Sequence, residues 1–248
     1  MTKHKRPVSW FRTIIAWGLG VPVTGLFSSL ALLSFLFTRS GTVVHMCSRG
    51  WARTMLYMLG IKVNVSGMEN LPGEGESVLI IANHQSAVDI LVFAGYFPIR
   101  FAWIAKKELF KIPILGPAMK AAGNIAIDRL QKENAFEALD TAAQQLQKLT
   151  VVIFPEGTRS RDGRVGKFKA GATFLAHSAG APLLPVTITG SWERLPPDDW
   201  KIAPGTVSIH IDSQIDIGEM SRREISRELQ GIRDEMISRV DKSQVLPA

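Results

Sequence analysis

A histidine and an aspartate lie five positions apart, directly after the apolar stretch Val78–Ala82, in the segment 83–89 that reads NHQSAVD. On a single helix, residues at this spacing would lie about 140° apart, so a strand, a turn and a helix are needed to bring them together. Ser86 and Asp89 have the spacing of a capping box, which predicts a helix starting at Ser86 and a carboxylate turned back toward the imidazole of His84.

A paired imidazole and carboxylate can perform general-base catalysis. The carboxylate fixes the tautomer of the ring and stabilises the imidazolium that forms when a proton is taken up. The alternatives for His84 are a histidine that is hydrogen-bonded in a turn and one ligand of an incomplete metal set.

A second polar segment, FPEGTRS at 154–160, follows the β-branched stretch Val151–Ile153. Between Arg159 and Gly171 the chain carries five cations, one acid and three glycines ahead of a predicted helix. Arginine side chains and free backbone amides at a helix start suit a phosphate group, so this loop is a candidate anion site. An ordinary solvated basic loop is the alternative.

Two further segments are candidates for shaping the same site. Residues 123–129 predict a strand ending in Asp128 and Arg129, and because neighbouring acid and base side chains usually form structural pairs, Arg129 is the weaker ligand candidate. The apolar segment 184–186 predicts a buried strand beside the pocket.

The sequence lacks several common catalytic motifs. It contains no Gly-x-Ser-x-Gly, Walker loop, His-Glu-x-x-His or strand-linked Gly-x-Gly-x-x-Gly, and its single cysteine, Cys47, cannot form an internal disulfide. A base and an anion site without an evident enzyme nucleophile suit direct transfer, in which the hydroxyl of the substrate attacks an activated acyl group.

Short β-rich runs alternate with helical stretches after residue 60. This alternation predicts an α/β fold with a mostly parallel sheet flanked by helices, and a site at the carboxyl ends of the strands. The expected strands are Lys62–Ser66, Val78–Ala82, Phe101–Ala105, Asn124–Ile127, Val151–Phe154, Leu184–Thr189 and Thr206–Ile211. The expected helices lie near 87–96, 112–121, 133–149, 168–179 and 221–240.

The net charge of +7 arises entirely from the first 60 residues. They hold seven Lys or Arg and no acid, whereas the remaining 188 residues hold 22 groups of each sign. Basic residues confined to the flanks of an apolar segment are typical of a membrane surface, whereas a nucleic-acid footprint is expected on a folded face. We therefore expect residues 1–60 to anchor the chain to a membrane and residues 61–248 to form the α/β domain.

The apolar run Thr13–Thr38 contains 26 residues without a charge. As a helix it would be about 39 Å long, enough to cross the ~30 Å hydrocarbon core. However, Pro22 predicts a bend, and basic residues on both sides of the run favour a hairpin that dips into one leaflet over a full span. Two core helices of a soluble protein are the remaining alternative.

The residues after this run predict a second helix. His45, Arg49 and Arg53 recur every four residues, opposite a more apolar side, which predicts an amphipathic helix lying in the lipid headgroup layer.

Taken in order, the segments 83–89, 123–129, 154–160 and 184–186 resemble the four motifs of the glycerolipid acyltransferase family, most closely those of the bacterial 1-acylglycerol-3-phosphate acyltransferases. The resemblance extends over residues 60–215. It implies that His84 is the base, that Asp89 orients it, and that Glu156, Gly157, Thr158 and Arg159 shape the glycerol-phosphate site, with Lys106 and Arg129 as further contacts.

The resemblance also implies the reaction and its partners. An acyl group would pass from acyl-CoA or acyl-carrier protein to lysophosphatidic acid and give phosphatidic acid, without a metal or cofactor. The site would lie at the cytoplasmic face of the inner membrane, among anionic lipids and without nucleic acid. The alternatives are acylation of glycerol 3-phosphate or of an amino-lipid, and a non-catalytic module that binds anionic lipid.

Overall fold

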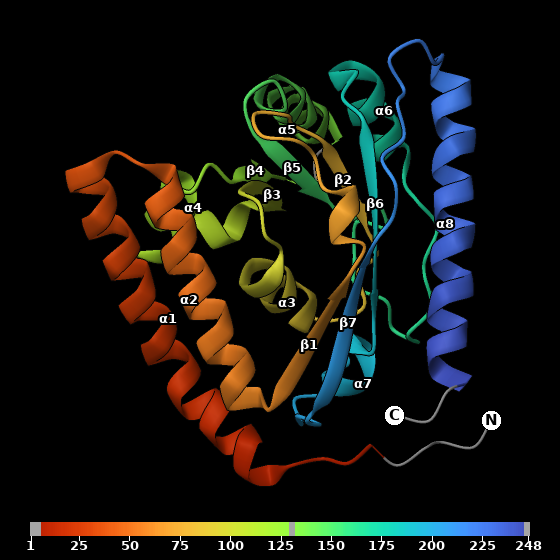
Figure 1. Ribbon diagram of the computed structural model, residues 1–248. Helices are drawn as coiled ribbons and strands as arrows, with labels where there is room; N and C mark the ends of the chain where they lie inside the picture. Colours follow the sequence, from red (N-terminus) through yellow and green to blue (C-terminus); the bar gives the residue numbers. More distant parts are fainter. Residues whose placement is uncertain (1–5, 129–131, 246–248) are drawn as a thin grey trace.

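The computed structural model describes residues 6–128 and 132–245 and contains a seven-stranded sheet with the order β1-β7-β6-β2-β5-β3-β4 (Figure 1). Its strands are β1 (Ile61–Ser66), β2 (Leu79–Ala82), β3 (Phe101–Lys106), β4 (Ile125–Ile127), β5 (Thr150–Ile153), β6 (Leu183–Thr189) and β7 (Gly205–Ile211). Among the paired strands of the described residues, only β6 and β7 are antiparallel. The predicted α/β fold with a mostly parallel sheet is confirmed.

Helices cover both faces of this sheet, because its central strands are apolar on both sides. Every residue of β2 is buried, and Ile80 packs in the core on one face while Leu79 and Ile81 pack in the core on the other. Alternation along a strand produces this division. Figure 1 shows α3 (Val88–Tyr96) with the N-terminal helices on one side, and α8 (Arg222–Val245) on the other.

The remaining elements are α4 (Leu115–Ala121), α5 (Lys132–Gln145), α6 (Ala170–Ala179), α7 (Ser191–Arg194) and two 3₁₀ helices, η1 (Met68–Asn70) and η2 (Lys107–Lys111). All seven predicted strands and all five helices predicted after residue 60 are present, with ends shifted by a few residues. The sequence did not predict η1, η2 or α7, since elements this short carry no measurable hydrophobic period.

The N-terminal segment forms two packed antiparallel helices, α1 (Trp10–Thr38) and α2 (Gly41–Leu59), with the chain reversal at Arg39 and Ser40 (Figure 1). The predicted N-terminal helical hairpin is confirmed, but it does not turn inside the apolar run, because α1 continues through Pro22 for 29 residues. A proline removes only one backbone donor from a helix. The reversal instead follows the first charge after the run, where Arg39 adopts a left-handed conformation.

Most of α1 is exposed although it is apolar. Its buried residues are the small side chains Thr13, Ala16, Ser28 and Ala31. Its large exposed side chains are Trp10, Phe11, Ile14, Trp17, Leu19, Val21, Leu26, Leu30, Leu33, Leu36 and Phe37. Within the described part of the chain, α1 is the helix long and apolar enough to cross a membrane. This exposure argues against the alternative of a soluble core helix, which would bury such residues.

The basic side of α2 faces the α/β domain, so Arg49 and Arg53 are not free to contact lipid headgroups as the sequence pattern suggested. Arg49 donates a hydrogen bond to the carbonyl of Phe97, and Arg53 Nε donates to the carbonyl of Gly95 at 2.9 Å. His45 packs edge-on against an aromatic ring of β3. The carbonyl groups at the end of α3 attract cations because they carry partial negative charge. The basic residues therefore dock the hairpin onto the domain.

A close approach between α1 and α2 depends on Gly50. A Cβ atom there would lie 2.9 Å from the ring of Phe27, whereas a Cβ atom at Gly18 would meet nothing within 4 Å. We expect Gly50→Leu to destabilise the protein by about 1–3 kcal/mol through overpacking, and Gly18→Leu to cause no loss. Thermal unfolding in detergent measures both effects, and equal melting temperatures for the two variants would contradict this packing.

Candidate active site

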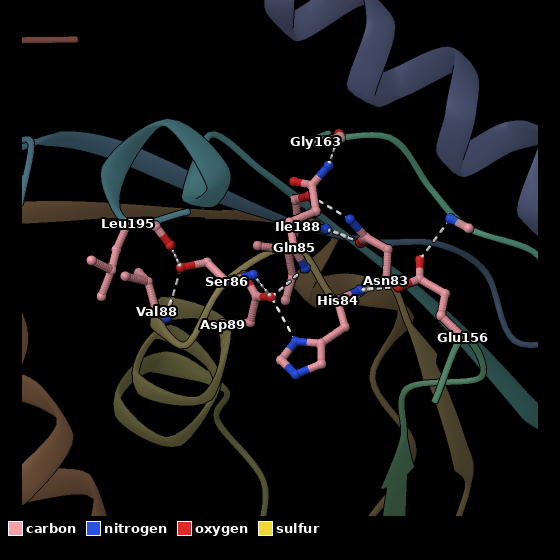
Figure 2. A network of polar contacts seen from close by, with 11 residues as sticks. Asn83, His84, Gln85, Ser86, Val88, Asp89, Glu156, Gly163, Ile188 and Leu195 are labelled. Atoms are coloured by element: carbon pink, nitrogen blue, oxygen red, sulfur yellow. Dashed lines mark hydrogen bonds and ion pairs between the residues drawn. The ribbon is translucent and has the colours of Figure 1, made fainter. Parts of the chain in front are cut away.

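The first and third predicted segments meet because the strands before them are neighbours. β2 and β5 are parallel and Ile81 lies opposite Ile153, so residues 83–89 and 154–160 leave the same edge of the sheet. β6 lies on the other side of β2. Figure 2 shows His84 and Asp89, the two side chains with the candidate catalytic chemistry. Both belong to residues 83–89.

The predicted contact between His84 and Asp89 is present. His84 Nδ1 lies 2.8 Å from Asp89 Oδ2, and the same oxygen accepts hydrogen bonds from the backbone amides of Gln85 at 2.7 Å and Ser86 at 2.8 Å. Asp89 is completely buried. A carboxylate oxygen can only accept hydrogen bonds, so this contact places a proton on His84 Nδ1. Figure 2 shows the other ring nitrogen, Nε2, pointing away from this network.

The capping box at Ser86 is only partly present. The Asp89 carboxylate accepts from the Ser86 amide as predicted, but α3 begins at Val88 with Ala87 as its cap. Ser86 Oγ accepts from the Val88 amide at 3.1 Å and donates to the carbonyl of Leu195 at 2.6 Å. The predicted helix start at Ser86 was therefore slightly too early, because the hydroxyl also bonds to a distant loop that sequence spacing does not reveal.

Both the backbone amide and the carbonyl of His84 form hydrogen bonds with the segment 154–160. Its amide donates to Glu156 Oε2 at 3.2 Å, and its carbonyl accepts from the Ser160 amide at 2.9 Å. Gln85 Nε2 adds a bond of 2.5 Å to the carbonyl of Gly163 (Figure 2). The loop 156–163 thus wraps around the peptide that carries the imidazole.

Asn83 fixes the same peptide to the strand on the opposite side. Its Nδ2 donates to the carbonyl of Ile188 at 2.9 Å and its Oδ1 accepts from the Ile188 amide at 2.7 Å. Asn83 is fully buried. The two bonds imitate a backbone pairing and extend the contact between β2 and β6 by one residue.

Glu156 lies behind His84 and is almost completely buried, with 4% of its surface exposed. Its oxygens accept from the amides of His84 and, at 3.3 Å, Gly166. Burial raises the pKa of Glu156 to about 8, although both backbone hydrogen bonds act in the opposite direction. The carboxyl group links the end of β2 to the loop that follows β5.

Two aromatic rings form a wall beside the imidazole. Phe154 stacks on His84 with ring centroids 4.0 Å apart and an interplanar angle of 12°, and Trp103 stacks on Phe154 at 5.5 Å. Only 12% of the His84 side chain is exposed. The sequence analysis included Phe154 in a motif but gave it no role, and it did not identify Trp103. The available signal was an aromatic residue directly after β5 and another inside β3.

The other predicted site residues are more exposed. Thr158 and Arg159 lie on the outer part of the loop after Gly157, whose φ of 70° requires a glycine. Lys106, at the end of β3, is 60% exposed and lies 3.6 Å from Glu108. Arg129 lies outside the described residues. Within those residues there is also no group of three His, Cys, Asp or Glu side chains that could hold a metal ion.

Comparisons with known proteins identify the family and the fold of this chain. Residues 62–189 match the acyltransferase family. A crystal structure of the 1-acyl-sn-glycerophosphate (LPA) acyltransferase PlsC from Thermotoga maritima superposes with a TM-score of 0.82 at 26% identity, covering 96% of each chain.

Curated relatives carry a related description. The chain is 35% identical over 153 residues to the chloroplastic 1-acyl-sn-glycerol-3-phosphate acyltransferase LPAT1 of Arabidopsis thaliana, covering 61% of this chain and 42% of that protein. It is 34% identical over 169 residues to the 1-acyl-sn-glycerol-3-phosphate acyltransferase of Pseudomonas aeruginosa, covering 66% and 64%. The chain thus spans less than two thirds of the length of these relatives.

The raised pKa of Glu156 predicts a pH effect on stability. Between pH 4.5 and about 8 the folded protein retains a proton that the unfolded chain releases, so this residue makes stability fall as pH rises through that window. Glu156→Gln cannot ionise, and we expect its unfolding free energy to fall less from pH 5 to pH 8 than that of the unmodified protein. Denaturant unfolding at several pH values tests this, with the exposed Glu235→Gln as control. If the unfolding free energies of all three proteins changed equally with pH, this contribution of Glu156 would be excluded.

Proposed function

This chain belongs to the acyltransferase family, and on that premise we propose that it transfers a fatty acyl group from acyl-CoA or acyl-carrier protein to the sn-2 hydroxyl of 1-acyl-sn-glycerol 3-phosphate, giving phosphatidic acid. The observation that carries the proposal is the 2.8 Å contact between His84 Nδ1 and the buried Asp89 carboxylate. The contact through Nδ1 fixes the orientation of the imidazole ring and leaves Nε2 available as a base.

In this reaction His84 Nε2 takes the proton from the acceptor hydroxyl as its oxygen attacks the thioester carbonyl. The tetrahedral intermediate then expels the thiolate, which receives the proton from the imidazolium, so that an ester and a free thiol are formed. Asp89 stabilises the imidazolium between these steps. No covalent acyl-enzyme is required.

The residues around the pair would position it and the acceptor. Glu156 and Ser160 bond to the backbone of His84, which supports a positioning role for the loop 156–163. Thr158 and Arg159, on the exposed part of that loop, would bind the glycerol phosphate, since arginine can bond two phosphate oxygens at once. Lys106 and Arg129 would be further contacts of the phosphate.

The long exposed α1 supports a membrane location for this reaction. We assign residues 1–60 as the membrane anchor and residues 61–248 as the acyltransferase domain, at the cytoplasmic face of the inner membrane. A lysophospholipid acceptor stays largely in the bilayer, because its acyl chain loses about 0.8 kcal/mol per CH₂ group on leaving it. An anchored base therefore meets an acceptor that is already at the membrane surface.

The catalytic role of His84 predicts a large loss in turnover. His84→Ala should lower kcat by roughly 10²–10⁴, which is the usual contribution of a general base, while binding of lysophosphatidic acid is retained. The exposed His177→Ala on α6 should leave kcat unchanged. A radiolabelled acyl-transfer assay with lysophosphatidic acid and glycerol 3-phosphate as competing acceptors measures both. Full activity of His84→Ala, or preference for glycerol 3-phosphate, would contradict the proposal.

The phosphate role of Arg159 predicts a different kinetic effect. Arg159→Ala should raise the KM for lysophosphatidic acid about tenfold or more with a smaller change in kcat, because the lost contact already exists in the bound ground state. Arg222→Ala, on α8, is the control for loss of an exposed cation. An unchanged KM would remove Arg159 from the phosphate site.

A further inference from the structure

The connection between β3 and α4 presents apolar side chains to the exterior. Leu109, Ile112 and Ile114 are 39%, 43% and 46% exposed. We propose that residues 107–114 form a second membrane contact, which inserts these three side chains into an anionic bilayer surface beside the helical hairpin. This inference rests on the membrane attachment proposed above and adds a contact within the acyltransferase domain to it.

The backbone at Ile114 holds this segment in an uncommon conformation. Ile114 has φ 67° and ψ −54°, and the Leu115 amide bonds to the carbonyl of Pro113 at 2.7 Å, which together define a classic γ-turn. A β-branched residue at positive φ is costly, and such strain tends to be retained where it serves a purpose. Here the turn directs an isoleucine outward at the start of α4.

The segment is closely packed on its inner side. The Gly116 amide bonds to the carbonyl of Ile112 at 2.8 Å, and a Cβ atom at Gly116 would lie 2.1 Å from the carbonyl oxygen of Phe110. Any larger residue at Gly116 would collide with this backbone. The exposed apolar side chains are therefore presented by a compact turn, which needs little ordering on binding.

The turn leads into α4, which packs against the helical hairpin. Ala118 of α4 packs in one buried cluster with Ala31 of α1 and Val44 of α2, and Phe35 packs against that cluster. Figure 1 shows α4 beside the end of the hairpin where α1 and α2 are joined. The exposed Leu33, Leu36 and Phe37 belong to this end of α1.

Lysine side chains lie near the three apolar residues, which indicates an anionic lipid surface as the partner. Lys106, Lys107, Lys111 and Lys120 are all exposed. Lys106 and Lys107 lie 3.6 and 3.5 Å from Glu108 and Asp128, and the ion pairs of the described residues include neither Lys111 nor Lys120. Each basic residue near an anionic membrane strengthens its binding. Exposed apolar side chains with lysines beside them suit the boundary of a bilayer, where acyl chains meet anionic headgroups.

This contact would also orient the candidate active site. The turn directly follows β3, the strand that carries Trp103, and Trp103 stacks on Phe154, which in turn stacks on His84. A domain held at both the hairpin and this turn cannot rotate about the hairpin alone. The base would therefore keep one orientation relative to the membrane surface.

A site-specific fluorescent probe tests the contact. In a Cys47→Ser background, the variants Ile112→Cys, Phe37→Cys and Glu235→Cys are each labelled with an environment-sensitive NBD dye and mixed with vesicles of 70% phosphatidylcholine and 30% phosphatidylglycerol. Phe37 reports the exposed end of α1, and Glu235 lies on α8, on the opposite face of the sheet. We expect a blue shift and quenching by doxyl-labelled lipid at positions 112 and 37, and neither change at 235.

The outcomes separate the two proposals. A probe at position 112 that stays in water while the probe at 37 enters lipid would overturn the second contact and leave the anchor standing. Probes at both positions that stay in water would overturn both. As a second measurement, Ile112→Glu should weaken partition into the same vesicles roughly three- to tenfold with kcat unchanged in detergent. Unchanged partition would also contradict the inference.

Discussion

A carboxylate in a protein interior remains charged only if hydrogen-bond donors replace the water it has lost, and the candidate site is organised around this requirement. Oδ2 of Asp89 accepts from two backbone amides and lies against the imidazole of His84, whereas its buried Oδ1 has no hydrogen-bond partner among the described residues. Those two amides exist in the right place only because the chain turns sharply between β2 and α3. Hydrogen bonds fix this turn on two sides. Asn83 bonds to β6, and Glu156 and Ser160, which follow β5, bond to the backbone of His84.

The N-terminal hairpin follows from the same electrostatic reasoning. The carbonyl groups at the end of α3 are partially negative, and Arg49 and Arg53 of α2 donate hydrogen bonds to them. This contact orients α2, and α1 then packs on the outer side of α2 with its large apolar residues exposed. As α3 also carries Asp89 in its first turn, one helix connects the candidate active site to the hairpin.

Local patterns in the sequence predicted most of the fold. Strand periodicity located β1 to β7, and the positions of His84 and Glu156 directly after predicted strands placed both at the carboxyl ends of the sheet, although not on neighbouring strands. The contacts of Glu156 and Ser160 with the His84 backbone were not predictable, because they join residues more than 70 positions apart through main-chain groups that no side-chain type reveals. The orientation of α2 was also misjudged, since its basic face fits a membrane surface and a helix end equally well. Arg129 lies outside the described residues and stays a prediction.

The central claim is that Asp89 holds His84 with its proton on Nδ1, so that Nε2 is free to act as a base. Nitrogen-15 NMR of the histidine side chains, at a pH where the ring is neutral, measures this tautomer directly. The account predicts a protonated Nδ1 and an unprotonated Nε2 for His84, and a loss of this preference in Asp89→Ala. A neutral His84 with its proton on Nε2 in the unmodified protein would contradict it.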